Sequence, residues 1–242
     1  LCFAHQSHAS KSGTSAGALT LGGMDVRLHQ TPMIYMDYKK ASAGWFSVRI
    51  ENIFLRTKGG ISVVAANVQN TTRTERVDAD NGPLNGNGEI IVDSGTTETY
   101  LYHGLEEPFK KAWKEVTKTN FMGQTPMRIS KSQVKELPTI LVQIQATPES
   151  NEDGIAGLAG DLDPKRPKDI IWAIPPTNYM ELEPFTHTYI CRFYFSEVRG
   201  GVLGANAMMG HDVMFDVENT RIGIAESSCD YSSLDAKAKS TR

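Results

Sequence analysis

Short apolar segments separated by turn-forming residues recur along this 242-residue chain. In the clearest of them, residues 44–55, apolar and polar side chains alternate from Phe46 to Ile50, which is the period of two expected of a strand with one buried face. Many short strands with few helices indicate a barrel or a sandwich, so we predict an all-β fold with one or two short helices. Further segments of this kind lie at residues 17–23, 59–68, 88–95, 137–145, 187–195, 200–208, 211–219 and 220–227.

One segment favours a helix instead. Residues 102–119 repeat apolar side chains at helical spacing, with acidic residues early and lysines late, as the helix dipole prefers. The polar residues 71–88 are expected to form a hairpin with a mobile tip, and residues 157–169 a surface loop. The predicted buried face of the helix consists of Leu105, Phe109, Ala112, Trp113 and Val116.

Charge and composition narrow the function classes. The net charge is -3, and lysines and arginines are scattered, so the chain lacks the basic field that nucleic-acid binding requires. No apolar run approaches the roughly 18–20 residues of a membrane-spanning helix. No two of the three cysteines form a Cys-x-x-Cys pair, and His5 and His8 have no further ligands clustered near them. We therefore expect no metal and no cofactor.

The stretch Glu-Ile-Ile-Val-Asp-Ser-Gly-Thr-Thr at residues 89–97 joins an apolar run to polar residues. The run predicts a buried strand, and a carboxylate at its end, Asp93, would be partly desolvated. Gly95 lets a backbone N–H approach that carboxylate, and the neighbouring hydroxyls are further donors. The simplest interpretation is a turn. The alternative is half of an acid/base site, which requires a second carboxylate to share a proton.

The sequence around Asp93 resembles the Asp-Thr/Ser-Gly-Thr/Ser signature of pepsin-like aspartic proteases, in the form typical of their C-terminal lobe. Val202–Gly204 is similar to the family's hydrophobic-hydrophobic-Gly strand, and residues 215–225 to the hairpin that follows it. Residues 17–29 resemble the segment that leaves the first lobe and enters the second. The resemblance runs in order over roughly residues 1–230, and it implies a single pepsin-like C-terminal lobe.

The resemblance also implies residue roles. Asp93 would be the catalytic aspartate, with Gly95 and Thr96 hydrogen-bonded to its carboxylate and Thr97 as a further hydroxyl. Ser94 would clasp the motif of the opposite lobe. The implied activity is that of an aspartic endopeptidase, in which water attacks a peptide bond of a polypeptide without a covalent intermediate. The supporting strand beneath the motif would consist of Val202, Leu203 and Gly204.

The chain departs from the family pattern because it has only one such motif. The similar sites at 80–83 and 152–155 lack both the preceding strand and the following hydroxyl. We expect the second aspartate to come from an N-terminal lobe of the same precursor or of a separate chain, and this chain alone to be inactive. Three alternatives remain open: a homodimer of the retroviral type, a non-catalytic binding protein similar to the pepsin-like xylanase inhibitors, and a structural β domain with a turn at this motif.

The cysteine layout resembles that of the membrane-anchored beta-secretase type, which implies a disulfide between Cys2 and Cys229. We interpret Cys191 as a buried free thiol. With the glycosylation sequon at Asn70, the resemblance implies a glycoprotein of the secretory pathway, the vacuole or lysosome, or the cell exterior. The resemblance leaves room for a membrane anchor outside this chain. The first residues are typical of a strand entered part-way, as expected of a processed chain or a fragment.

The predicted organisation has three parts. Residues 1–43 form the crossing segment and entry strands, residues 44–230 the C-terminal catalytic lobe, and residues 231–242 a polar tail.

Overall fold

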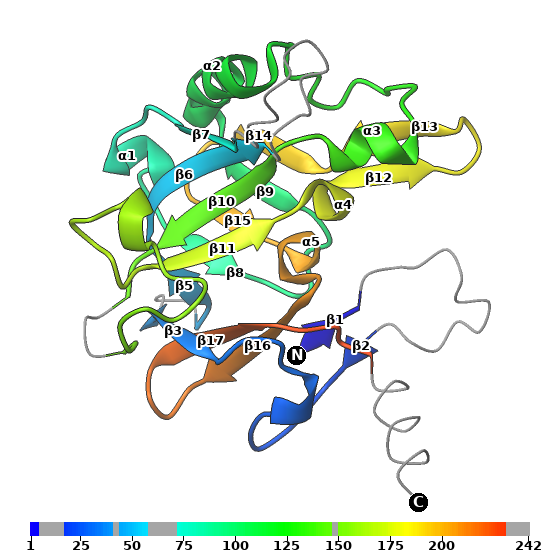
Figure 1. The fold of residues 1–242 in the computed structure, drawn as a ribbon. Coiled ribbons are helices and arrows are strands. Elements are labelled where there is room, and N and C mark those ends of the chain that lie inside the picture. The colour runs from blue at the N-terminus through cyan, green and yellow to red at the C-terminus, as the bar shows by residue number, and fades with distance from the viewer. Residues whose placement is uncertain (5–16, 41–43, 58–71, 147–149, 231–242) are drawn as a thin grey trace, which may run out of the picture. The chain divides into compact units, whose positions relative to one another are not determined.

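The computed structural model describes residues 1–4, 17–40, 44–57, 72–146 and 150–230 (Figure 1). Most of its elements are strands, joined by a few short helices, which confirms the predicted all-β class. The chain forms two compact units that interleave along the sequence. The first comprises Leu1–Phe46, Gln145–Ile170 and Met208–Arg242, and the second comprises Ser47–Ile144 and Ile171–Ala207. The three-part division expected from the sequence stays a prediction.

The first unit contains one five-stranded sheet with the strand order β2-β1-β16-β17-β3. Its longest pair is the β16–β17 hairpin, antiparallel from His211 opposite Glu226 to Asp216 opposite Arg221. Val213, Ile222 and Ile224 on these strands are buried, with Val213 fully so, and the polar His211 and Asp212 are buried at the start of β16. The unit also holds the short helices η1, Val26–Leu28, and η3, Gly160–Leu162. Its strands are Cys2–Phe3 (β1), Gly17–Ala18 (β2), Ile34–Asp37 (β3), His211–Asp216 (β16) and Arg221–Glu226 (β17).

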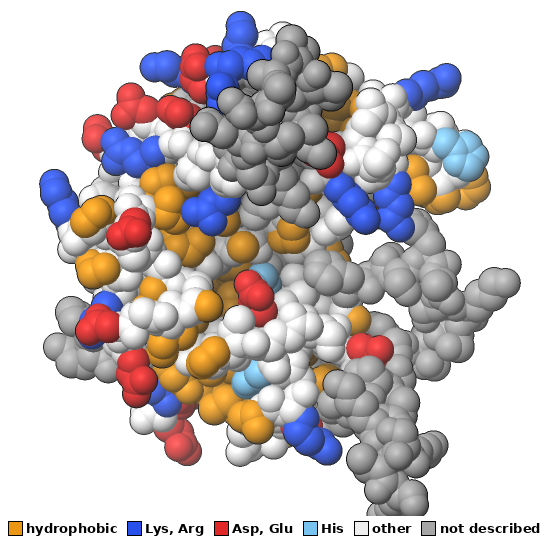
Figure 2. Space-filling model, in the orientation of Figure 1, with side chains coloured by type: hydrophobic (Ala, Val, Ile, Leu, Met, Phe, Trp, Pro, Cys, Tyr) orange, Lys and Arg blue, Asp and Glu red, His pale blue; other side chains and the backbone are white. Residues whose placement is uncertain are grey.

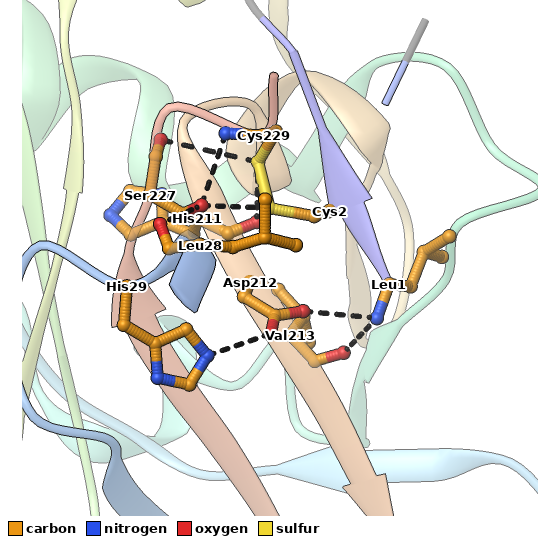
Figure 3. Close-up of a disulfide and its surroundings, with 9 residues drawn as sticks. All are labelled: Leu1, Cys2, Leu28, His29, His211, Asp212, Val213, Ser227 and Cys229. Carbon is orange, nitrogen blue, oxygen red and sulfur yellow. Dashed lines mark hydrogen bonds and ion pairs between the residues drawn. A yellow bond between two sulfur atoms is a disulfide. The ribbon is translucent and has the colours of Figure 1, made fainter. Parts of the chain in front are cut away.

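A disulfide joins Cys2 to Cys229 across 227 residues of sequence (Figure 3). Both half-cystines are buried, and the Cys229 N–H donates to the Ser227 hydroxyl at 3.0 Å. Beside this bridge the buried Asp212 carboxylate contacts His29 Nε2 at 2.8 Å and the Leu1 amine at 3.2 Å. The pairing of the two cysteines implied by the resemblance is therefore present in the structure.

The second unit contains most of two further sheets and a separate hairpin, β12–β13. One sheet has the order β14-β9-β15-β8-β5-β4, and the other has the order β11-β10-β6-β7. Strand β4 belongs to the first unit, and β5 and β11 lie where the chain passes between the units along the sequence. The bounds are Lys39–Lys40 (β4), Phe46–Val48 (β5), Ile50–Thr57 (β6), Arg73–Arg76 (β7), Ile90–Val92 (β8), Thr99–Tyr102 (β9), Thr139–Ile144 (β10), Ile170–Ile174 (β11), Met180–Glu183 (β12), Thr188–Cys191 (β13), Phe193–Glu197 (β14) and Gly201–Leu203 (β15).

The predicted helix is present as α2, Glu106–Thr117, preceded by the 3-10 turn η2, His103–Leu105. It packs against β6 and β7, and all five side chains of the predicted apolar face are buried. Phe109 stacks on Phe193 with ring centroids 5.7 Å apart, within a larger aromatic core. The other helices are short: Asn81–Leu84 (α1), Lys131–Lys135 (α3), Pro176–Tyr179 (α4) and Ala205–Met208 (α5).

The hairpin predicted over residues 71–88 is wrong. In the described part of this stretch, β7 pairs with β6 instead, and the chain then turns into α1. The physical reason is tertiary: Leu84 is buried, and the Asn85 side chain exchanges two hydrogen bonds with the backbone of Ile50. A local polar pattern does not reveal such a partner 35 residues away.

Several predicted strands are shorter or divided. Only Gly17–Ala18 of residues 17–23 forms a strand, and residues 44–55 divide into two strands at Arg49. Residues 187–195 likewise divide at Arg192. The segment 59–68 and the sequon residue Asn70 lie outside the described residues, as does the tail 231–242.

Candidate active site

Asp93 stands at the end of β8, where the sequence predicted it. This strand pairs in parallel with β15, so that Val92 lies opposite Leu203. The pairing continues one residue further, because the Asp93 N–H donates to the Leu203 carbonyl at 3.1 Å. The Val92 and Leu203 side chains are buried, whereas Asp93 is half-buried. A rigid, paired strand therefore delivers this carboxylate to a place where solvent still reaches it.

Each oxygen of the Asp93 carboxylate accepts one hydrogen bond from its own turn. The Gly95 N–H donates to Oδ1 at 2.9 Å, and the Thr96 hydroxyl donates to Oδ2 at 2.7 Å. A Cβ on Gly95 would stand 3.2 Å from Oδ1, closer than most real contacts, so glycine suits this approach. Both oxygens keep further lone pairs for a water or a second acid.

The neighbouring hydroxyls differ in their roles. Ser94 and Thr97 are exposed, and neither hydroxyl makes a hydrogen bond to any residue that the structure describes. The sequence predicts donors from all three hydroxyl residues of the motif, but only the Thr96 hydroxyl reaches Asp93 among the described residues. Thr97 contributes through its backbone, because its carbonyl accepts the Asn206 N–H at 3.0 Å.

Val202, Leu203 and Gly204 lie directly against the motif. Gly204 has no room for a side chain: a Cβ there would stand 2.2 Å from the Glu98 carbonyl oxygen and 2.7 Å from that of Thr96. Val202 pairs in parallel with Ile91 through β15 and β8. The strand beneath the motif therefore holds the turn in place through backbone contacts that only glycine permits.

Two buried polar residues that sequence reasoning missed complete this support. The Thr99 hydroxyl donates to Asn206 Oδ1 at 2.7 Å, and Asn206 Nδ2 donates to the Arg192 carbonyl at 2.8 Å. Nearby, the Trp172 indole donates to the Ala207 carbonyl, within α5, at 2.8 Å. One sequence signal could have revealed this support: an asparagine in the otherwise small and apolar sequence Gly-Ala-Asn-Ala that follows β15. A buried polar side chain needs a hydrogen-bond partner, so this asparagine predicts one.

Other kinds of site find no support in the described ranges. In them, no group of three or more His, Cys, Asp or Glu side chains is placed to hold a metal ion. No helix within the same ranges has the length and apolar character needed to cross a membrane. On the face shown in Figure 2, Lys, Arg, Asp and Glu side chains are interspersed.

The structure combines an all-β fold with an Asp-Ser-Gly-Thr turn at the end of a strand, and a hydrophobic-hydrophobic-Gly strand lies against that turn. This combination defines the class of the pepsin-like acid proteases. Comparison with known families agrees: the family model of the eukaryotic aspartyl proteases matches residues 4–227. This chain belongs to the eukaryotic aspartyl protease family. A search of curated proteins found no match.

Proposed function

We propose that this chain supplies one of the two catalytic aspartates of an aspartic endopeptidase, and that Asp93 is this residue. The observation behind the proposal is the carboxylate itself, in the family's motif, with one donor on each oxygen. Ser94, Gly95, Thr96 and Thr97 form the turn that positions it. Val202, Leu203 and Gly204 support that turn from below.

The proposed chemistry needs two carboxylates that share one proton. Like charge pushes their pKa values apart, so the ionised member takes a proton from water while the protonated member polarises the peptide carbonyl. The water attacks the carbonyl carbon, and the resulting tetrahedral species breaks down to an acid and an amine. Neither step requires a metal, a cofactor or a covalent intermediate. Asp93 alone supplies half of this pair.

The proposed partner is an N-terminal lobe that carries the second aspartate, and the proposed substrate is an extended polypeptide. A row of exposed apolar side chains supports a partner at the crossing segment. Leu19 is 69% exposed, Leu21 84% and Val26 66%, all within ten residues of each other. Such a row is unfavourable in water and favourable when another protein surface covers it. The exposed Ser94 hydroxyl is in turn available to the motif of the opposite lobe.

The proposed location is the secretory pathway, the vacuole or lysosome, or the cell exterior. The Cys2–Cys229 disulfide supports an oxidising compartment. The proposal includes glycosylation of Asn70, in the sequon Asn-Thr-Thr. It also leaves room for a membrane anchor outside this 242-residue chain.

The first test replaces the carboxylate in an enzyme assembled from this chain and an N-terminal lobe of the same family. We expect Asp93→Asn to lower kcat for a peptide substrate by at least about a thousandfold, because loss of the acid/base group removes on the order of 4 kcal/mol or more. The matched control is Asp78→Asn, since the Asp78 side chain is 82% exposed. A fully active Asp93→Asn enzyme would remove Asp93 from the mechanism.

A further inference from the structure

A group of charged and aromatic side chains borders the Asp93 turn in the second unit. Tyr100 in β9 and Tyr194 in β14 are register partners in parallel strands, and their rings stack with centroids 5.0 Å apart. Glu98 and Arg192 each stand two residues before one of these tyrosines, so the period of two brings them to the same face. Four side chains from two adjacent strands and the residues just before them therefore converge at one place.

Hydrogen bonds and ion pairs tie the group together. The Tyr100 hydroxyl donates to Glu98 Oε2 at 2.6 Å, and Arg192 Nη1 lies 3.4 Å from Glu98 Oε1. On the other side, Arg192 Nε donates to Glu181 Oε2 at 2.5 Å, and Nη1 donates to the Tyr194 hydroxyl at 3.2 Å. The hydrogen bond to the Glu98 carboxylate raises the pKa of Tyr100 to about 12. One guanidinium thus stands between two carboxylates.

The group lines an open recess of about 400 Å³, which we call the acidic recess. Glu98 and Arg192 in its lining carry opposite charges, and the bordering Glu181 carboxylate, which pairs with Arg192, leaves the group one negative charge in excess at neutral pH. Glu181 is 60% exposed at its side chain, and its Oε1 accepts no hydrogen bond from any described residue. The acidic recess is lined by Glu98, Tyr100, Gln124, Ile190, Arg192 and Tyr194, and Glu181 borders it through Arg192.

The acidic recess lies next to the candidate catalytic turn. Glu98 follows Asp93 by five residues, with no strand or helix between them. The carbonyl oxygens of Glu98 and Thr96 both lie against Gly204, within 2.7 Å of the place where its Cβ would stand. Asn206 connects the two sites, because its side chain donates to the Arg192 carbonyl and its N–H donates to the Thr97 carbonyl of the motif. A polypeptide bound at Asp93 would thus have the recess within reach of its neighbouring residues.

We propose that the acidic recess binds a basic side chain, arginine or lysine, of the polypeptide on which the enzyme acts. The excess carboxylate charge attracts a cation, and the free Glu181 oxygen is an acceptor for it. The stacked tyrosines add aromatic surface that favours a guanidinium or an ammonium group. As a statement about a substrate, this inference rests on the proposed peptidase function. Glu98 and Glu181 are the residues that would set the specificity.

The test measures peptide binding to the 242-residue chain, without turnover. Three blocked tripeptides serve as probes: acetyl-Gly-Arg-Gly-amide, its neutral citrulline analogue and its glutamate analogue. NMR signals of the Tyr100 and Tyr194 rings report occupancy. We expect the arginine peptide to shift both rings and the citrulline peptide to bind about three- to tenfold more weakly, as a partly exposed ion pair would give.

Charge-neutral variants identify the responsible carboxylates. Glu98→Gln and Glu181→Gln should each weaken arginine-peptide binding about three- to tenfold. The control Glu115→Gln removes the same charge from the exposed face of α2 and should leave binding unchanged. Because Glu181 is 60% exposed, its variant also guards against a failure of Glu98→Gln to fold. Equal binding of the arginine and citrulline peptides would overturn the proposal. So would tighter binding of the glutamate peptide, which would assign the recess to anions through Arg192, or the absence of ring shifts with every probe.

The same probes separate this inference from the proposed catalysis. If Asp93→Asn kept full turnover in the assembled enzyme, the catalytic proposal would fail while recess binding stood. If Asp93→Asn abolished turnover while the arginine peptide left both rings unshifted, only the recess would fail.

Discussion

Gly204 shows how one missing side chain determines the geometry of the candidate site. Its Cα approaches the carbonyls of Glu98 and Thr96 so closely that any Cβ would overlap the backbone. The Asp93 turn and the strand beneath it are consequently held at a separation that no other residue allows. The constraint comes from the backbone itself, so a rotamer change could not relieve it.

We predict that Gly204→Ala destabilises the chain by about 3 kcal/mol, as expected of an overpacked site whose neighbours are backbone atoms. The control is Gly23→Ala, because nothing lies within 4 Å of the place where its Cβ would stand. Urea unfolding of both variants measures the difference. Equal stability of the two would mean that the contact at Gly204 is not as tight as described.

Tyr100 gives a prediction about pH. Its hydroxyl donates to the Glu98 carboxylate, which raises its pKa from 10.0 to about 12. Because the folded state holds this proton more tightly than the unfolded state, the stabilisation is fully present below pH 10 and is lost as the pH rises toward 12. We predict that Glu98→Gln moves the Tyr100 pKa back toward its ordinary value.

The measurement is tyrosinate absorbance across an alkaline titration, with Tyr100→Phe identifying the signal of this ring. Tyr179 serves as an internal reference, since burial raises its pKa well above the ordinary range independently of Glu98. An unchanged Tyr100 titration in Glu98→Gln would show that the hydrogen bond is not the cause of the shift.

At the scale of single elements, the sequence predicted those features that depend on residues close together in the chain. Helix α2 was predicted because its apolar spacing and charge order are local, and the Asp93 turn because Gly95 and Thr96 lie two and three residues away. Helix α3 was missed although its capping box, Ser130 with Gln133, is also a local signal. The Asn206 bridge and the acidic recess depend on strand pairings that a local pattern does not contain.

Helix α2 ends at Thr117, and the residue that caps it, Lys118, has a left-handed backbone with φ 61°. Glycine adopts this conformation without the Cβ penalty, so we predict that Lys118→Gly is about 1 kcal/mol more stable than Lys118→Ala. Comparing the two variants cancels the loss of the lysine charge, which pairs with Glu115 at 3.4 Å. Thermal unfolding measures the difference, and a more stable alanine variant would contradict the described helix end.

At the scale of the whole molecule, the disulfide constrains the unfolded chain more than the folded one. Cys2 and Cys229 close a loop of almost the entire sequence, and the entropy that this removes from the unfolded chain has an upper value of about 5 kcal/mol. We predict that the double variant Cys2→Ser, Cys229→Ser loses about 2–5 kcal/mol of stability. Urea unfolding measures this loss.

The control for the disulfide is Cys191→Ser, which changes a thiol that lies outside the bridge. Burial raises the pKa of the Cys191 thiol to about 12, so this thiol should resist alkylation at neutral pH until the chain unfolds. Undiminished stability of the double variant would show that the bridge adds nothing beyond the native contacts around it.

In the proposed function, Asp93 forms half of an active site. The most direct measurement is a titration of the 242-residue chain with a separately prepared N-terminal lobe of the family, followed by hydrolysis of a fluorogenic peptide at acid pH. We predict no turnover by the chain alone, and turnover that rises to a plateau at one lobe per chain and is absent with Asp93→Asn. Turnover by the chain alone that Asp93→Asn abolishes would contradict the claim, because the chain would then supply both carboxylates itself.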